Sequence, residues 1–214
     1  MKARVKFLLV VVLLTASAFC FKLSAQNPQT PVLLPLLDSL TLDTMEGYTD
    51  LNEALKNPEK VTKIVLRKHK YTQFPAELWK FPNLQYLDLG KNNIKEVPDS
   101  INYFKNLQVL HLSKNKIEFI PREIGDLSNL MILDLNQNEL VAIPPQIGKL
   151  KKLQYLDLWS NNLSIFPEEL KDISGNLKIL DLRAILINKQ TQDHIKSLLP
   201  NTLIHFSPPC KCDQ

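Results

Sequence analysis

Apolar residues recur at a fixed interval along most of the chain. Segments that begin at Val61, Leu84, Leu107, Leu130, Leu153 and Leu177 are offset by 23, 23, 23, 23 and 24 residues. In each segment the first, fourth and sixth places are apolar, as in Leu84, Leu87 and Leu89. Alternation around the fourth and sixth places is typical of a short strand. We therefore expect one strand per segment, with these leucines facing inward and places three, five and seven facing out.

Two further features follow each predicted strand. Asparagine occupies the ninth place in four segments, as Asn92, Asn115, Asn138 and Asn161. An apolar–proline pair comes next, as Phe74-Pro75, Val97-Pro98, Ile120-Pro121, Ile143-Pro144 and Phe166-Pro167. Buried asparagine side chains can satisfy backbone groups where the chain bends away from a strand, and proline suits an outer arc that needs no N–H donor. The pattern predicts a ladder of asparagines from one segment to the next.

With leucines, asparagine and proline in register, residues 61 to about 206 resemble the leucine-rich repeat family, in its short 23-residue bacterial and Ras-suppressor-like class. The resemblance implies an α/β solenoid, a leucine-rich repeat horseshoe with a parallel concave β-sheet. A single unit cannot bury its leucines, whereas stacked units can. The concave sheet is then the broad solvent-facing surface.

Both ends of the repeat region depart from the pattern. A solenoid requires such ends, because a bare terminal repeat would expose its hydrophobic core. Residues 47–60 are expected to form an N-terminal helical cap, in which Asp50 and Glu53 offer a capping box. The repeat domain itself spans residues 61–206, with six repeats of which the last is a cap. There Ile185 replaces the asparagine, and an apolar stripe of helical spacing precedes a closing strand at residues 202–206.

The first 25 residues are predicted to be a secretory signal peptide. Basic residues precede an unbroken apolar run at 7–14, and small residues follow up to Ala25. Cleavage there would export the protein to a secreted, periplasmic or cell-envelope location, without a membrane span. Residues 26–46 would form an extended leader that packs loosely or stays flexible, and residues 207–214 a C-terminal tail with a Cys-x-Cys motif.

Export changes the charge of the mature chain. The whole sequence has 26 basic and 22 acidic residues, a formal charge of +4. Four of the basic residues and none of the acidic ones fall within residues 1–25, so the mature chain has 22 of each and no net charge. Net charge therefore gives no reason to expect nucleic acid or an anionic membrane as a partner.

Two cysteines, Cys210 and Cys212, remain after removal of the signal peptide. An oxidising compartment permits a disulfide within the tail, and a disulfide between chains, a contact with a soft metal, or two free thiols are equally open. Two cysteines fall short of the four ligands of a structural zinc site. The four histidines show no ligand spacing, so no metal and no cofactor is predicted.

Places five and seven contain the chemically active side chains of the expected concave face. His111 lies between Asp88 and Asp134 in the neighbouring repeats, with Ser113 two residues further along, which superficially resembles a nucleophilic set. An open sheet offers neither an oxyanion hole nor a pocket that excludes water, so no catalytic residue is assigned. We expect the aspartates to be a solvated row whose repulsion is relieved by neighbouring Lys and Arg, with Lys68, Lys91 and Lys114 supplying some of that relief.

The remaining hypothesis is a non-enzymatic protein that binds a protein partner through the concave face. Exposed aromatic and charged residues favour protein contacts because they bury a large area at modest entropic cost. The predicted contact residues are Arg67, Tyr86, His111, Tyr155, Trp159 and Arg183. Carbohydrate or envelope-polymer binding is one alternative, and a structural role in the envelope is another.

Overall fold

The computed structural model describes residues 33–210. The predicted signal peptide, residues 26–32 of the leader, and Cys212 lie outside the described residues. Cys210 lies within them and is disulfide-bonded. Within the described part, no helix is long and apolar enough to cross a membrane.

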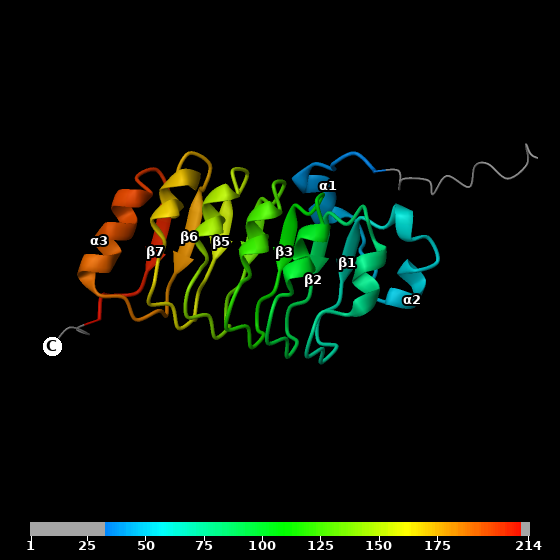
Figure 1. Cartoon of the computed structure of the whole chain (residues 1–214), viewed down its shortest axis with the longest axis horizontal. Helices are drawn as coiled ribbons and strands as arrows, with labels where there is room; N and C mark the ends of the chain where they lie inside the picture. The colour runs from blue at the N-terminus through cyan, green and yellow to red at the C-terminus, as the bar shows by residue number, and fades with distance from the viewer. Residues whose placement is uncertain (1–32, 211–214) are drawn as a thin grey trace, which may run out of the picture. The chain divides into compact units, whose positions relative to one another are not determined.

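One parallel sheet runs through the described residues, and its seven strands follow the order of the chain (Figure 1). The strands are β1 (Lys63–Val65), β2 (Tyr86–Asp88), β3 (Val109–His111), β4 (Ile132–Asp134), β5 (Tyr155–Asp157), β6 (Ile179–Leu182) and β7 (Leu203–Phe206). Each residue pairs with its counterpart one repeat later, so Leu87 lies beside Leu110. The predicted solenoid with a parallel sheet is confirmed.

Short helices return the chain between strands and form a layer in front of the sheet in Figure 1. The 3₁₀ helices are η1 (Pro58–Lys60), η2 (Ala76–Lys80), η3 (Asp99–Tyr103), η4 (Arg122–Asp126), η5 (Pro145–Lys149) and η6 (Glu168–Ile173), and the α-helices are α1 (Ser39–Thr44), α2 (Leu51–Ala54) and α3 (Lys189–Leu198). From η2 on, a proline of the apolar–proline pair immediately precedes each 3₁₀ helix, for example Pro98 before η3. Its fixed φ suits that position, which needs no N–H donor.

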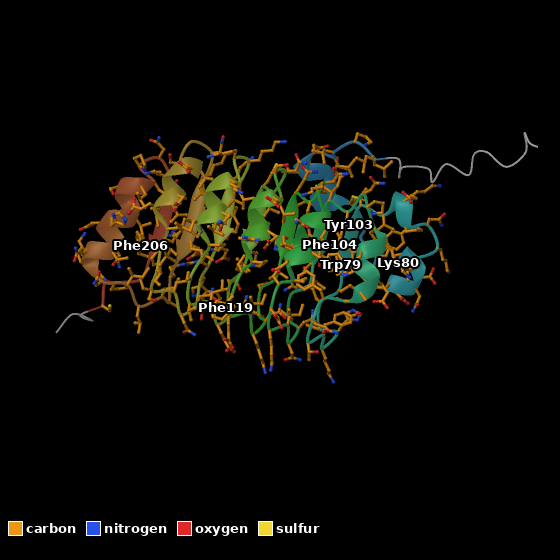
Figure 2. The ribbon with its side chains drawn as sticks, viewed as in Figure 1. Trp79, Lys80, Tyr103, Phe104, Phe119 and Phe206 are labelled. Carbon is orange, nitrogen blue, oxygen red and sulfur yellow. The ribbon has the colours of Figure 1, made fainter. Side chains whose placement is uncertain are left out.

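The core lies between the sheet and the helical layer. The leucines at places one, four and six are completely buried in each middle repeat, as Leu107, Leu110 and Leu112 show. An aromatic cluster closes the convex side near the N-terminal end, where Trp79 of η2 stacks on Phe104 with ring centroids 5.0 Å apart (Figure 2). Tyr103 of η3 meets Trp79 edge-on at 6.4 Å. Trp79 is therefore a packing residue of the convex layer.

The ninth-place asparagines link successive repeats. Asn115 donates from Nδ2 to the carbonyls of Leu89, 3.1 Å away, and Leu112, 2.9 Å away. Its Oδ1 accepts from the N–H of Ile94 at 3.0 Å. Asn92, Asn138 and Asn161 repeat this arrangement. Each asparagine thus pairs with buried backbone groups at the point where the chain leaves the sheet. An unpaired backbone group there would be costly.

The caps differ in detail from the expectation. Asp50 caps α2 by accepting from the N–H of Asn52 at 2.8 Å, but Glu53 pairs with Lys56 rather than completing a capping box. Part of the N-terminal cap is strand-like, because Tyr48 pairs in parallel with Ile64 and extends the edge of the sheet. At the other end, α3 and β7 form the helix and closing strand that the pattern predicts.

The leader was expected to be extended, but its described part includes a short helix. Asp38 caps the short helix α1 (Ser39–Thr44), since its Oδ1 accepts from the N–H of Thr41 at 3.0 Å. Leu42 of this helix is completely buried. An Asp followed by polar and apolar residues supplies an N-cap that the prediction overlooked, and the segment packs at the N-terminal end of the sheet.

Candidate functional site

The concave face carries three columns of side chains, at places three, five and seven of the repeats. Asp88, Asp134, Asp157 and Asp181 lie in the fifth-place column, in register across the sheet. Each accepts a hydrogen bond from the backbone N–H two residues further along. These carboxylates therefore hold the seventh-place residues where each strand ends.

The expectation of a solvated acid row is wrong. All four aspartates are buried, with exposed fractions between 4% and 9%. Of the neighbouring Lys and Arg expected to relieve the row, arginines do so, whereas none of Lys68, Lys91 and Lys114 forms an ion pair within the described residues. The aspartate side chains turn toward backbone N–H groups, and this removes the carboxylates from water. A buried carboxylate is costly unless a cation or hydrogen-bond donors compensate its charge, so the partners of each aspartate matter.

Three of the four carboxylates have a cationic or ionisable partner. Arg67 Nη1 lies 2.6 Å from Asp88 Oδ2, His111 Nδ1 lies 3.1 Å from Asp134 Oδ2, and Arg183 Nη2 lies 2.5 Å from Asp181 Oδ2. Burial raises the pKa of Asp181, but the hydrogen bonds and charge of Arg183 outweigh it and hold that pKa below its ordinary value. The two arginines therefore neutralise Asp88 and Asp181, and His111 lies within hydrogen-bond distance of Asp134.

Asp157 differs from its neighbours. Among the described residues no Lys, Arg or His nitrogen lies within ion-pair distance of it, and its partners are neutral donors. Asn136 Nδ2 lies 2.8 Å from Oδ2, the Trp159 N–H 3.0 Å from Oδ1, and the Tyr155 hydroxyl 3.4 Å from Oδ2. Burial, joined by repulsion from Asp134 and Asp181, outweighs the hydrogen bonds and raises the pKa of Asp157. The buried carboxylate lacks a counter-charge.

Two aromatic side chains flank Asp157 on its own strand. Tyr155 occupies the third place and Trp159 the seventh, and both are partly exposed. Burial and the nearby aspartates raise the pKa of Tyr155 to about 12, so its hydroxyl keeps its proton and remains a donor to Asp157. The ring of Trp159 lies outside the contiguous core of the repeats. Carboxylate, phenol and indole thus form one group, which we call the Asp157 cluster.

A second group lies at β1–β3. The rings of Tyr86 and His111 are 5.4 Å apart, and Arg67 reaches across to Asp88 over Gly90. A Cβ at Gly90 would lie 3.0 Å from Arg67 Nη1 and 3.0 Å from Asp88 Oδ1, so the absence of a side chain leaves room for the ion pair. Burial raises the pKa of Tyr86 to about 12, with Asp88 adding to the effect.

The predicted contact residues therefore fall into two groups rather than one. Tyr86 and Tyr155 share the same place but lie on β2 and β5, with β3 and β4 between them. At about 4.8 Å per strand, that is roughly 14 Å. Arg67, Tyr86 and His111 belong to the first group, and Tyr155, Trp159 and Arg183 to the second.

The lysines near the N-terminal end of the sheet differ in exposure. Lys63 is buried, and its Nζ donates to the carbonyls of Leu42 at 2.6 Å and Asp43 at 3.1 Å. The eighth-place lysines Lys68, Lys91 and Lys114 remain exposed, each with a left-handed backbone near φ 60°. Repulsion from Lys68 and Lys114 lowers the pKa of Lys91, so these lysines form a positive row beside the face.

The arrangement does not support nucleophilic catalysis. Within the described residues no hydrogen bond joins Ser113 to His111, and Ser113 is buried. His111 is instead directed to Asp134. No group of three His, Cys, Asp or Glu side chains in residues 33–210 could hold a metal ion. What the face offers is hydrogen bonding, charge and aromatic contact.

Sequence reasoning placed Tyr155 and Trp159 on the face but missed Asp157 and Asn136 as its polar centre. The register of the strands was visible in the sequence, and so was the seventh-place Asn136 in the repeat before Trp159. The missing information was the direction of the Arg183 side chain. It turns back to Asp181 in its own repeat and leaves Asp157 unpaired.

The solved structures that are similar to this chain include the following two. A leucine-rich repeat protein of Leptospira interrogans is 29% identical, with a TM-score of 0.58, over 78% of this chain and 49% of that one. This chain therefore spans about half the length of the Leptospira protein. The BIR2 ectodomain of Arabidopsis thaliana is 27% identical, with a TM-score of 0.49, over 56% of this chain and 67% of that one. A search of curated proteins found no match.

A family model supplies the stronger result. The model described as a leucine-rich repeat region matches residues 63–206, which is more than half of the chain and includes all of the strands from β1 to β7. The short bacterial class of repeat stays a prediction. The chain belongs to the leucine-rich repeat family.

Proposed function

We propose that this chain is an exported, non-enzymatic protein that binds a protein partner through its concave face. The observation that carries the proposal is the Asp157 cluster: a buried carboxylate without a counter-charge, between a partly exposed tyrosine and a partly exposed tryptophan. Leucine-rich repeat folds serve as scaffolds for protein–protein interaction, which supports the same class of function.

The chemistry of the cluster favours a basic side chain of the partner. A guanidinium or ammonium group above Asp157 would supply the charge that Arg67 and Arg183 supply to Asp88 and Asp181. Charge-assisted hydrogen bonds of this kind are among the stronger polar contacts. The aromatic rings would add cation–π attraction and exclude water, as at the centres of many interfaces.

The experiment compares variants of the exported protein for binding to the partner that co-purifies with it. Trp159→Ala should weaken binding by about 1–3 kcal/mol and leave the melting temperature nearly unchanged. Phe119→Ala is the matched control, because Phe119 is an exposed aromatic residue on the turn side of the repeats, outside the concave columns (Figure 2). It should bind as the wild type does.

Leu156→Ala provides the opposite control. Leu156 is completely buried beside Asp157, so its loss should cost about 2–5 kcal/mol of stability, with the surface contacts still present in the folded fraction. The assignment of the face fails if Trp159→Ala lowers the melting temperature and binding is unaffected, or if Phe119→Ala weakens binding equally. A partner found to be a glycan on an array would move the function to carbohydrate binding.

Export rests on the predicted signal peptide and needs its own measurement. The intact mass of protein recovered from the cell envelope or the medium should correspond to a chain that begins at Gln26. A mass that includes residues 1–25, in protein recovered only from the cytoplasm, would contradict this part of the proposal.

A further inference from the structure

Side chains at the start of the strands bind the main chain of the leader segment, which we define as residues 33–45. Leu34 N–H donates to Asn83 Oδ1 at 2.8 Å, and Leu37 N–H donates to Gln85 Oε1 at 2.8 Å. Gln85 Nε2 in turn donates to the carbonyl of Pro35 at 2.9 Å. One glutamine therefore binds an acceptor and a donor two residues apart on the same extended segment.

A second glutamine completes the arrangement. Gln108 Nε2 donates to the carbonyl of Leu37 at 2.9 Å and to Gln85 Oε1 at 3.0 Å. Both backbone groups of Leu37 are thus bound by side chains of the repeats. We call Gln85 and Gln108 the glutamine rim. Because the rim contacts backbone atoms, its hydrogen bonds do not depend on which side chains the bound segment carries.

The burial of the rim depends on the bound segment. Gln85 is completely buried and Gln108 is 5% exposed, whereas Gln154 occupies the same second place of a later repeat and is partly exposed. Gln154 directs its Nε2 to Met131 Sδ at 3.9 Å, a weak acceptor. Buried amides need partners, and at Gln85 and Gln108 the extended chain supplies most of them.

Other contacts hold the leader segment from outside the rim. Leu42 is completely buried but does not belong to the contiguous core of the repeats. The Lys63 ammonium binds carbonyls at the C-terminal end of α1, where a cation is favourable. Just beyond the segment, Gly47 passes so close that a Cβ there would lie 2.8 Å from Lys63 Cγ.

From this geometry we propose that the glutamine rim is a binding site for an extended peptide, and that the leader segment is its resident ligand. The site takes an extended main chain in which a proline, here Pro35, lies two residues before the residue whose N–H and carbonyl are both bound, here Leu37. A helical turn with a buried leucine, here Leu42, follows. It lies at the start of β2 and β3, separate from the Asp157 cluster, and does not rest on the function proposed for that cluster.

Hydrogen exchange tests the resident ligand. In Gln85→Ala/Gln108→Ala the amide of Leu37 should exchange at least about tenfold faster than in the wild type, because its acceptor, Gln85 Oε1, is lost. The amide of Leu110, in the core of β3, should keep its protection. Gln154→Ala is the matched control and should leave the leader unchanged. Unchanged protection of Leu37 in the double variant would overturn the proposal.

A peptide added in trans tests the site itself. In Leu42→Asp the leader loses its anchor while the rim and the core stay intact. A labelled synthetic peptide of residues 33–45 should then bind this variant at least about tenfold more tightly than the wild type, whose own segment fills the site. Adding Gln85→Ala to Leu42→Asp should remove the gain. Equal binding of the peptide to the wild type and Leu42→Asp, by fluorescence anisotropy, would refute a peptide site at the rim.

Discussion

Trp159 and Asp157 are joined by a hydrogen bond of 3.0 Å from the backbone N–H of the tryptophan to Oδ1 of the aspartate. The carboxylate that holds the end of β5 in place is therefore also the one that lacks a cationic partner within the described residues. This position links stability to the proposed binding, because a group that would favour a basic partner is costly to keep ionised in its absence.

The first prediction concerns Asp157→Asn. The pKa of Asp157 is raised above its ordinary value of 3.8, so its contribution to stability is present at low pH and is lost as the pH rises through the folded-state value. The amide should therefore raise the stability at pH 7, by less than about 1 kcal/mol, or a few degrees in melting temperature. The gain should disappear below pH 3.8, while partner binding at pH 7 weakens. A lower melting temperature at pH 7 would show that the ionised carboxylate stabilises the fold.

Asp181→Asn should behave in the opposite way. Arg183 holds the pKa of Asp181 below 3.8, so the ion pair contributes stability above that pH and loses it as the pH falls through the lower folded-state value. Since Arg183 is more than half exposed, we expect a loss of about 0.5–1 kcal/mol at pH 7. Thermal unfolding of the variant and the wild type at pH 7, without added salt and in 1 M salt, measures this loss of stability. A loss that salt does not reduce would contradict an electrostatic origin.

Asn161 and Asn162 are adjacent and should respond very differently to alanine. Asn161 Nδ2 donates to the carbonyls of Leu135 and Leu158, and its Oδ1 accepts from the Leu140 N–H. Asn161→Ala leaves these buried groups without partners and should cost about 2–4 kcal/mol. Asn162 is exposed, so Asn162→Ala should change stability by less than about 0.5 kcal/mol. Urea unfolding of both variants gives the comparison, and equal losses would argue against the ladder as a source of stability.

Two glycines offer a similar matched pair. A Cβ at Gly148 would lie 2.6 Å from the carbonyl oxygen of Glu169 in the next repeat, whereas a Cβ at Gly175 would meet nothing within 4 Å. Gly148→Ala must separate neighbouring repeats, and we expect a loss of about 1–3 kcal/mol. Gly175→Ala should be neutral or stabilise the protein by up to about 1 kcal/mol, because it restricts the unfolded chain. A Gly148→Ala variant as stable as the wild type would show that the η5–η6 contact adapts at little cost.

The sequence alone predicted the elements that repeat. Leu107, Leu110 and Leu112 recur at positions whose direction a strand determines, so their burial follows from periodicity. Asn115 follows at a constant distance, and a stack of identical units places it beside its counterparts. Trp159 was assigned to the face for the same reason, since the seventh place points away from the leucines.

Tertiary structure decided the features that do not repeat. Which aspartate is left without a cation depends on whether Arg183 turns to Asp157 or to Asp181, and both directions are compatible with the same strand register. The contact of Leu37 with Gln85 joins residues 48 positions apart, outside any periodic pattern. Periodicity determines the direction of a side chain relative to its own strand, whereas pairing between unique side chains depends on distances that only the folded chain sets.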